Sequence, residues 1–322
     1  MIKENTLYIV VPCYKEEEVL PETSKRLREK LHALMKAGKI SEQSRILFVN
    51  DGSKDRTWEI ISELHQQDSI FSGVNLSRNR GHQNALLAGL TTAVQYADML
   101  ISMDADLQDD INAVDAMVDA YHEGFEVVYG VRSSRKTDTF FKRFTAEGFY
   151  KLMKALGVDI VFNHADYRLM SKRAVEGLME FEEVNLFLRG IVPQIGYKWT
   201  TVEYERAKRF AGESKYPLKK MLAFAFDGIT SFSVKPMRLI LSLGAIIFVL
   251  SILALIWALI ARFTGHTEGG WASLMCSIWM IGGIQLLCLG VIGEYIGKIY
   301  KETKKRPRFI IERVLDANME RK

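Results

Sequence analysis

Two long uncharged apolar runs near the carboxyl end constrain this chain more than any other feature of its sequence. The first run covers Leu239 to Ala261, and the second covers Trp271 to Gly293. At 1.5 Å per residue, a helix of about 23 residues reaches about 35 Å, enough to cross a hydrocarbon core of about 30 Å. Because the connection at 262–270 is short, we predict a two-helix transmembrane hairpin; the alternative is a buried hairpin of a soluble protein.

Charged residues gather on one side of the predicted hairpin. Lys235 and Arg238 precede the first apolar run, whereas the connecting loop carries only Arg262 and Glu268. The second run is followed by a basic group, which consists of Lys298, Lys301, Lys304, Lys305, Arg306 and Arg308. Because positive charge marks the cytoplasmic ends of membrane helices, we expect a multi-pass membrane protein with both chain ends in the cytoplasm.

The part of the chain before the hairpin has the pattern of an α/β domain. Short runs rich in β-branched residues predict buried strands at 6–11, 46–49, 73–76, 99–103 and 127–129, and Pro12 should end the first of them. Apolar residues at helical spacing predict intervening helices, for example at 16–36 and 81–96. This alternation indicates a Rossmann-like, mostly parallel sheet with right-handed crossovers.

Composition excludes several other classes of protein. The formal net charge of +4 gives no support for a nucleic-acid partner. Cys13, Cys276 and Cys288 match no zinc-binding spacing, and we expect them to be reduced. The chain enters its first predicted strand almost at once, so we expect no cleavable signal peptide.

One predicted strand ends in a dense group of acids. The apolar run Met99 to Met103 is followed by Asp104, Asp106, Asp109 and Asp110, with Gln108 among them. Acids after a buried strand lie at the carboxyl edge of the sheet, where open α/β folds bind ligands. Hard oxygen ligands at this density suit Mg²⁺ or Mn²⁺. The alternative is that they solvate the turn and cap a helix starting near Ile111.

Polar residues follow the other predicted strands as well. Tyr14 and Glu16 follow the first strand, Asp51 the second, and Arg78 and Arg80 the third. In a parallel sheet these ends lie along one edge, so their convergence indicates a ligand site. Any one of them taken alone is equally explained as a turn or cap residue.

Several motifs together carry a resemblance to a known family. VVPCYKEEEVL, VNDGSKDRT, NRGHQNALLAG, MDADLQDD, GVRSSR and ADYRLMSKRAV follow one another in the order and spacing of family 2 glycosyltransferases with the GT-A fold. The two apolar runs, followed by GEYIGKIYKETKKRP, resemble those of bacterial polyprenyl-phosphate glycosyltransferases, whose catalytic domain is similar to dolichol-phosphate mannose synthase. The resemblance covers essentially the whole chain.

The resemblance implies a division of the chain into four parts. A GT-A catalytic domain covers 1–205, and a flexible loop with an amphipathic juxtamembrane helix covers 206–234. Two transmembrane helices at 235–297 precede a basic cytoplasmic tail at 298–322. Gly293 and Gly297 form a small-xxx-small pair, which permits close packing against a second copy in a homo-oligomer.

The resemblance also implies roles for the residues at the strand ends. Asp104, Asp106 and Gln108 would bind Mg²⁺ or Mn²⁺, and Asp106 would thereby take part in catalysis. The donor nucleotide would contact Pro12, Tyr14, Glu16, Asp51, Arg80 and Asp104. Asp51 would bind the uracil edge of a UDP-sugar, and Asp104 would lie near the ribose. For Arg80, a structural salt bridge is the alternative.

Basic residues further along would contact phosphate groups. Arg132 would bind the donor diphosphate, and Arg135 and Lys142 would extend this cationic wall toward the lipid phosphate, since guanidinium groups match phosphate geometry. The loop ERAKRFAGESKYP would close over the donor with Arg209, and its Ser214 and Lys215 would contact phosphate. The alternatives are a solvated basic face and plain juxtamembrane charge.

Asp166 lies in the motif HADYRLMS, where the resemblance implies an acid that faces the acceptor. Because a phosphate acceptor is already ionised at neutral pH, Asp166 could orient the acceptor rather than act as a base. The alternative is a helix cap for the segment that starts at Ser171. We count Asp166 as catalytic and leave these roles open.

The resemblance implies an inverting glycosyltransferase of the bacterial cytoplasmic membrane. It would move one sugar from UDP-glucose or UDP-N-acetylglucosamine to undecaprenyl phosphate on the cytoplasmic face. A flippase and an extracytoplasmic glycosyltransferase would then use the product to decorate a surface polymer such as O-antigen or teichoic acid. One rival is a processive polysaccharide synthase, although its Gln-x-x-Arg-Trp motif is absent. The other is a non-catalytic membrane protein that binds nucleotide-sugars.

Overall fold

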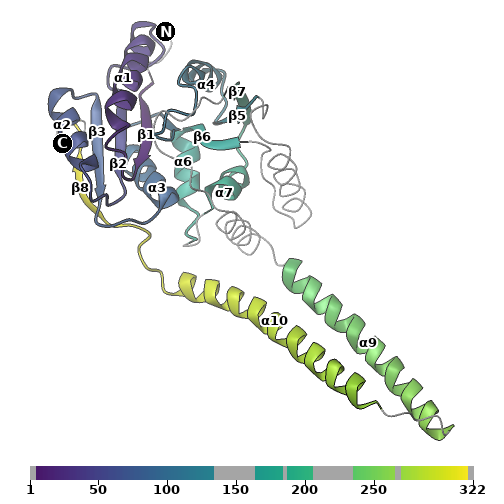
Figure 1. Ribbon diagram of the computed structural model, residues 1–322. Coiled ribbons are helices and arrows are strands. Elements are labelled where there is room, and N and C mark those ends of the chain that lie inside the picture. The colour runs from purple at the N-terminus through teal and green to yellow at the C-terminus, as the bar shows by residue number, and fades with distance from the viewer. Residues whose placement is uncertain (1–4, 134–163, 184–186, 206–234, 265–269, 318–322) are drawn as a thin grey trace.

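The computed structural model describes residues 5–133, 164–183, 187–205, 235–264 and 270–317. An α/β domain lies at one end of the molecule, and two long helices, α9 (Lys235–Phe263) and α10 (Trp271–Thr303), extend from it (Figure 1). The predicted loop and amphipathic juxtamembrane helix at 206–234 lie outside the described residues.

The α/β domain is built on an eight-stranded mixed sheet with the order β7-β5-β6-β4-β1-β2-β3-β8. Neighbouring pairs among β1, β2, β3 and β4 are parallel, β6 runs antiparallel to both β4 and β5, and β8 runs antiparallel to β3. The strands are β1 (Leu7–Cys13), β2 (Arg45–Asn50), β3 (Phe71–Leu76), β4 (Met99–Ser102), β5 (Val127–Arg132), β6 (His164–Ser171), β7 (Trp199–Tyr204) and β8 (Ile311–Leu315). The mostly parallel α/β sheet predicted from the sequence is therefore confirmed.

Helices cover both faces of this sheet. The residues of β1 alternate between two buried clusters, with Leu7 and Ile9 in one and Tyr8 and Val10 in the other. The first cluster packs against α1 (Leu20–Lys36), α2 (Thr57–Gln67) and α4 (Ala113–His122). The second packs against α3 (His82–Ala93), α6 (Lys172–Met179) and α7 (Leu188–Gln194). A strand buried on both faces needs a continuous apolar run, which is what the sequence shows there.

The prediction that Pro12 ends the first strand is wrong. β1 continues to Cys13, and Pro12 pairs with Val49 of the parallel neighbour β2. On its other side, β1 pairs with β4 only as far as Val10. Pro12 therefore lies where the sheet has already lost one neighbour, and its missing N–H group is tolerated there.

The carboxyl-terminal segment differs from the predicted basic tail. After α10 the chain returns to the α/β domain and adds β8 to the edge strand β3. Asp316 is buried and accepts a hydrogen bond from the Tyr8 hydroxyl at 3.2 Å. Arg308 donates to the carbonyl oxygen of Phe181 at 2.5 Å. The segment predicted as a tail therefore holds an integral strand of the sheet.

The two apolar runs lie within α9 (Lys235–Phe263) and α10 (Trp271–Thr303), which contact each other. Large apolar side chains on both helices are exposed, among them Leu241, Trp257 and Leu287. Within the described residues, the segment Met280–Thr303 is long and apolar enough to cross a membrane. The predicted helical hairpin is thus present, and its exposed apolar surface suits a lipid environment.

Candidate functional site

The carboxyl edge of the sheet brings the predicted site residues together. β1 to β4 are parallel, so their carboxyl ends lie at one edge, and β5 runs in the same direction because β6 is antiparallel to both β4 and β5. Asp104 follows β4, and Arg132 ends β5. The antiparallel β6 instead contributes Asp166, near its amino end, to the same edge.

Asp51 stabilises the turn between β3 and α3. Its carboxylate is buried and accepts hydrogen bonds from the backbone N–H groups of Arg80 at 2.7 Å and Gly81 at 2.9 Å. Burial raises the pKa of Asp51, and these N–H groups oppose the rise. The neighbouring Gly52 has φ = 61°, and a Cβ there would lie 2.5 Å from the backbone of Arg78. Only glycine fits this close approach, so the predicted proximity of these loops is confirmed.

The acidic loop after β4 holds two of its carboxylates in different surroundings. The Asp104 side chain is 45% exposed, whereas Asp106 is buried and accepts a hydrogen bond from the backbone N–H of Gln108 at 3.2 Å. Leu107, between Asp106 and Gln108 in this turn, adopts a left-handed backbone conformation with φ = 56°. A non-glycine residue in that conformation is strained, and such strain is typical of functional turns.

A histidine of α3 faces this loop. His82 Nε2 lies 3.4 Å from Asp104 Oδ1. Partial burial of its carboxyl raises the pKa of Asp104, His82 opposes the rise, and the carboxylates of Asp166 and Asp106 add to it. A carboxylate whose pKa is shifted by its neighbours is a common feature of ligand sites.

The oxygen atoms of the acidic loop suit a hard divalent cation in kind, but the loop alone does not supply a complete set of ligands. Asp104, Asp106 and Gln108 offer oxygen atoms, which Mg²⁺ and Mn²⁺ prefer. Within the part of the chain that the structure describes, no group of three or more His, Cys, Asp or Glu side chains is arranged to hold a metal ion. A cation here would therefore need ligands beyond the carboxylates, which agrees with the habit of Mg²⁺ to keep waters and share substrate phosphates.

Asp166 is held by two arginines, neither of which was predicted from the sequence as a site residue. Arg189 Nε lies 3.2 Å from Asp166 Oδ1, and Arg189 Nη2 lies 3.0 Å from Oδ2. The buried Arg168 adds a contact from Nη2 to Oδ1 at 3.3 Å. Burial alone would raise the pKa of Asp166, but Arg189 and Arg168 outweigh it and lower the pKa well below its usual value. Arg189 could have been noticed as a lone charge within the apolar segment NLFLRGIVP.

Two further acids of the loop have structural partners. Asp109 is buried and accepts a hydrogen bond from the Tyr204 hydroxyl at 2.6 Å. Burial and the nearby Asp104 raise the pKa of Asp109 to about 6. The Tyr167 hydroxyl donates to the carbonyl oxygen of Asp110 at 3.0 Å. The alternative that Asp166 caps the helix near Ser171 is wrong, because Ser171 caps α6 itself: its side chain accepts from the N–H of Ala174 at 3.0 Å.

The remaining predicted residues divide into two groups. Tyr14 lies just beyond β1 with its side chain about half exposed, and Glu16 donates its backbone N–H to the Thr57 hydroxyl at 3.1 Å. The other group lies outside the described residues and consists of Arg135, Lys142, Arg209, Ser214 and Lys215. The first group borders the carboxyl edge, so its predicted place near a donor is compatible with the fold.

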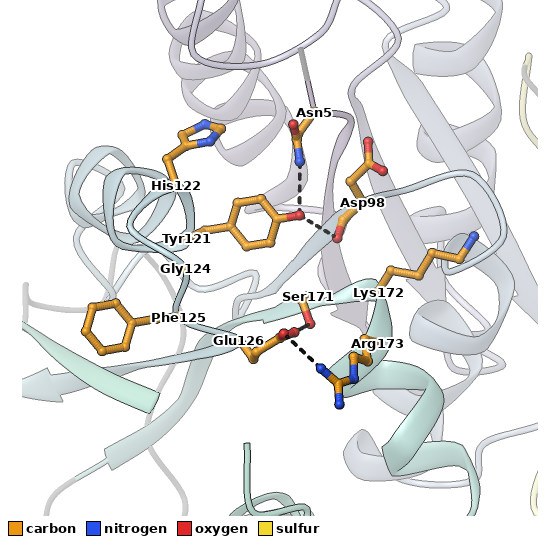
Figure 2. Close-up of a pocket in the computed structure, with 10 residues that line it drawn as sticks. All are labelled: Asn5, Asp98, Tyr121, His122, Gly124, Phe125, Glu126, Ser171, Lys172 and Arg173. Carbon is orange, nitrogen blue, oxygen red and sulfur yellow. Dashed lines mark hydrogen bonds and ion pairs between the residues drawn. The ribbon is translucent and has the colours of Figure 1, made fainter. Parts of the chain in front are cut away.

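A pocket at the opposite edge of the sheet does not belong to this site. The Tyr121 hydroxyl accepts from Asn5 at 3.0 Å and donates to the carbonyl oxygen of Asp98 (Figure 2). Below them, Glu126 contacts both Ser171 and Arg173. These polar groups pair with one another, so they serve the fold of the amino edge.

Comparisons with known proteins bear on the family. The family model for glycosyl transferase family 2 matches residues 8–179, and the model for the GtrB C-terminal hairpin matches residues 235–299. The uncharacterized glycosyltransferase YkoT of Bacillus subtilis is 56% identical over 306 residues, which cover 95% of this chain and 91% of that protein. A prophage bactoprenol glucosyl transferase homolog of Escherichia coli is 41% identical over 308 residues, which cover 95% of this chain and 98% of that protein.

A solved mannosyltransferase from Pyrobaculum calidifontis, in complex with GDP-Man and Mn²⁺, is 14% identical with a TM-score of 0.48, and the match covers 95% of this chain and 89% of that chain. The sequence relatives and the two family models carry the assignment. They confirm the family resemblance, the GT-A type of α/β domain and the carboxyl-terminal hairpin. The chain belongs to glycosyl transferase family 2.

Proposed function

We propose that this chain transfers one sugar from a nucleotide-sugar, UDP-glucose or UDP-N-acetylglucosamine, to undecaprenyl phosphate at the cytoplasmic face of a bacterial membrane. The observation that carries the proposal is the meeting of Asp104, Asp106 and Asp166 at the carboxyl edge of the sheet. Ser102 Oγ donates to the carbonyl oxygen of Asp166 at 2.5 Å, which joins the end of β4 to the start of β6. Relatives named bactoprenol glucosyl transferases support a lipid-linked acceptor.

The reaction we propose is a single displacement. An oxygen of the acceptor phosphate attacks the anomeric carbon of the sugar while the bond from that carbon to the donor diphosphate breaks. The bonding electron pair leaves with UDP, and attack from the opposite face inverts the anomeric centre. Alignment and charge neutralisation suffice for such a step, so no residue of the chain forms a covalent intermediate.

The acidic loop would hold the donor diphosphate through a divalent cation. Asp104 and Asp106, with Gln108 beside them, would bind Mg²⁺ or Mn²⁺, and a bound cation neutralises the charge that develops on the leaving diphosphate. The partial exposure of Asp104 supports this role, because one of its oxygens can face a ligand. Arg132, at the end of β5, would add positive charge on the same edge.

Asp166 would act on the acceptor as an ionised carboxylate. Two guanidinium groups keep its pKa well below the usual value, which disfavours a role as general base. A phosphate acceptor supplies its own nucleophilic oxygen near neutral pH and needs no base. The hydroxyl of a singly ionised phosphate could instead donate a hydrogen bond to Asp166, which would orient the attacking oxygen.

A donor screen tests the proposal. Purified full-length protein is incubated with Mg²⁺ or Mn²⁺ and one radiolabelled nucleotide-sugar at a time, with and without undecaprenyl phosphate. We expect one UDP-sugar to give UDP and a labelled lipid in equal amounts, and only when the lipid is present. A labelled polymer of many sugars would instead favour a processive synthase, and donor binding without transfer would favour a sensor.

A further inference from the structure

We propose that Arg189 is a positioning residue for sugar transfer, because its guanidinium grips both carboxylate oxygens of Asp166 and fixes the direction in which that carboxylate faces the acceptor. The inference rests on the proposed function, since it concerns how Asp166 meets the acceptor phosphate. Arg189 would act through Asp166 and would not itself touch either substrate.

The contact between the two side chains has a fork-on-fork geometry. Arg189 Nε lies 3.2 Å from Oδ1 of Asp166, and Arg189 Nη2 lies 3.0 Å from Oδ2. Two parallel charge-assisted hydrogen bonds hold a carboxylate in one plane, whereas a single bond would let it rotate. A lysine at this position would supply the charge without that planar constraint.

The element that carries Arg189 is firmly packed. Arg189 lies in the first turn of α7, where its neighbours Leu188, Ile191 and Val192 are buried in the core. The backbone N–H of Leu188 also donates to the side chain of Gln83 on α3 at 3.1 Å. Because its helix is fixed to the second core cluster, Arg189 can transmit that rigidity to Asp166.

Arg168 and Arg189 have different roles around Asp166. Arg168 is 1% exposed and lies on the same strand as Asp166, so its positive charge balances Asp166 within the interior of the domain. Arg189 is 32% exposed and reaches Asp166 from another element. Other titratable groups near Asp166 include His82 on α3 and Asp104 after β4. If Arg189 is replaced, Arg168 still balances the Asp166 charge, and the fold should survive while the orientation is lost.

A double-mutant cycle on transfer tests the proposal. The full-length chain is prepared as wild type, Arg189→Gln, Asp166→Asn and the double variant, with Arg189→Lys as the conservative change. At saturating donor, we expect Arg189→Gln to lower the turnover number about 100-fold with the donor KM within about twofold. In the Asp166→Asn background, Arg189→Gln should cause no further loss beyond about twofold. Arg189→Lys should recover only part of the rate.

Controls separate this role from a structural one. Arg173→Gln is the matched control, because it removes another arginine–carboxylate ion pair, in which Arg173 Nη1 lies 3.6 Å from Glu126 Oε1 at the amino edge of the sheet. This variant should leave the rate within about twofold of wild type. UDP binding by calorimetry and thermal unfolding should remain near wild type for Arg189→Gln. If UDP binding falls in parallel with transfer, Arg189 belongs to the donor site or to the fold, and the positioning role is overturned.

The outcome of the cycle distinguishes this inference from the proposed function. Losses that multiply in the double variant would show that Arg189 acts independently of Asp166, for example on a phosphate directly, and would overturn the inference alone. A wild-type chain that forms no glycosyl lipid would contradict the proposed function. In that case, a double-mutant cycle on thermal unfolding still measures the interaction between Arg189 and Asp166. If the two substitutions then had additive effects on stability, the contact itself would be contradicted.

Discussion

Asp51 and Asp104 each follow a strand of the parallel sheet, but their side chains differ in exposure and in hydrogen-bond partners. Both oxygens of Asp51 are engaged by backbone N–H groups of the turn before α3. Asp104 is 45% exposed and faces His82. Position after a strand was visible in the sequence, whereas the partner of each carboxylate depends on loops that are distant along the chain. The sequence therefore predicted that these acids lie at the carboxyl edge of the sheet, but it could not predict the exposure and the partners of each one.

The first prediction concerns Asp104 and Asp106. Asp104→Asn or Asp106→Asn should lower transfer by about 10²- to 10³-fold, because each removes charge that would hold a cation at the leaving diphosphate. Excess EDTA should abolish transfer by the wild-type chain. The control is Asp119→Asn on α4, which breaks the exposed ion pair of Asp119 with Lys39. Full activity in EDTA would contradict the metal assignment.

The second prediction concerns the raised pKa of Asp109. Its folded-state pKa is about 6 against an unfolded value near 3.9, so the folded chain binds this proton more tightly. The stabilising contribution is complete below about pH 4 and is lost as the pH rises to about 6, a change on the order of 3 kcal/mol. Asp109→Asn should remove this component of the pH dependence and keep the Tyr204 contact.

Thermal unfolding of wild type and Asp109→Asn is compared between pH 4 and 8 in the presence of a chelator. We expect the stability of the variant relative to wild type to increase across this range. An unchanged difference between the two proteins would mean that folding does not raise the pKa of Asp109.

At the scale of elements, the predicted strands were those with continuous apolar character. β1, β2, β3 and β4 were located to within a few residues because each is buried on both faces. The strands β6, β7 and β8 were not predicted. β7 is largely exposed, and β8 carries Glu312 and Arg313 after a basic stretch. Their strand form is set by pairing with distant partners, which a local pattern does not reveal.

The third prediction concerns β8. Truncation after Pro307 should expose the edge of β3 and lower both thermal stability and solubility, because an unpaired edge strand invites association. Asp316→Ala should cost about 1–3 kcal/mol, since it leaves the buried Tyr8 hydroxyl without this partner. Glu312→Ala on the same strand is the matched control, because it removes only an exposed hydrogen bond with Asn75. Thermal unfolding equal to wild type after truncation would show that β8 is dispensable.

At the scale of the whole molecule, β8 changes how the two parts are joined. The α/β domain precedes α9, and the chain after α10 returns to the edge of the same sheet. Two covalent connections therefore link the domain to the hairpin (Figure 1). The apolar length of the hairpin was predictable from composition, whereas the return of the chain required knowledge of the β3–β8 pairing.

The fourth prediction concerns topology. In a background without native reactive cysteines, Glu123→Cys in the α/β domain should react with an impermeant reagent only after the membrane is opened. Thr264→Cys, at the exposed position directly after α9, should react in intact cells. Labelling of Glu123→Cys from outside would contradict a cytoplasmic catalytic domain.

The central claim is that the carboxyl-edge site delivers a sugar to a lipid phosphate. The most direct measurement compares undecaprenyl phosphate with undecaprenol as acceptors for the full-length chain, with the radiolabelled UDP-sugar that the donor screen selects. We predict labelled lipid only from the phosphate, joined through a glycosyl phosphate that mild acid releases. Equal labelling of undecaprenol, or an acid-stable product, would contradict the account.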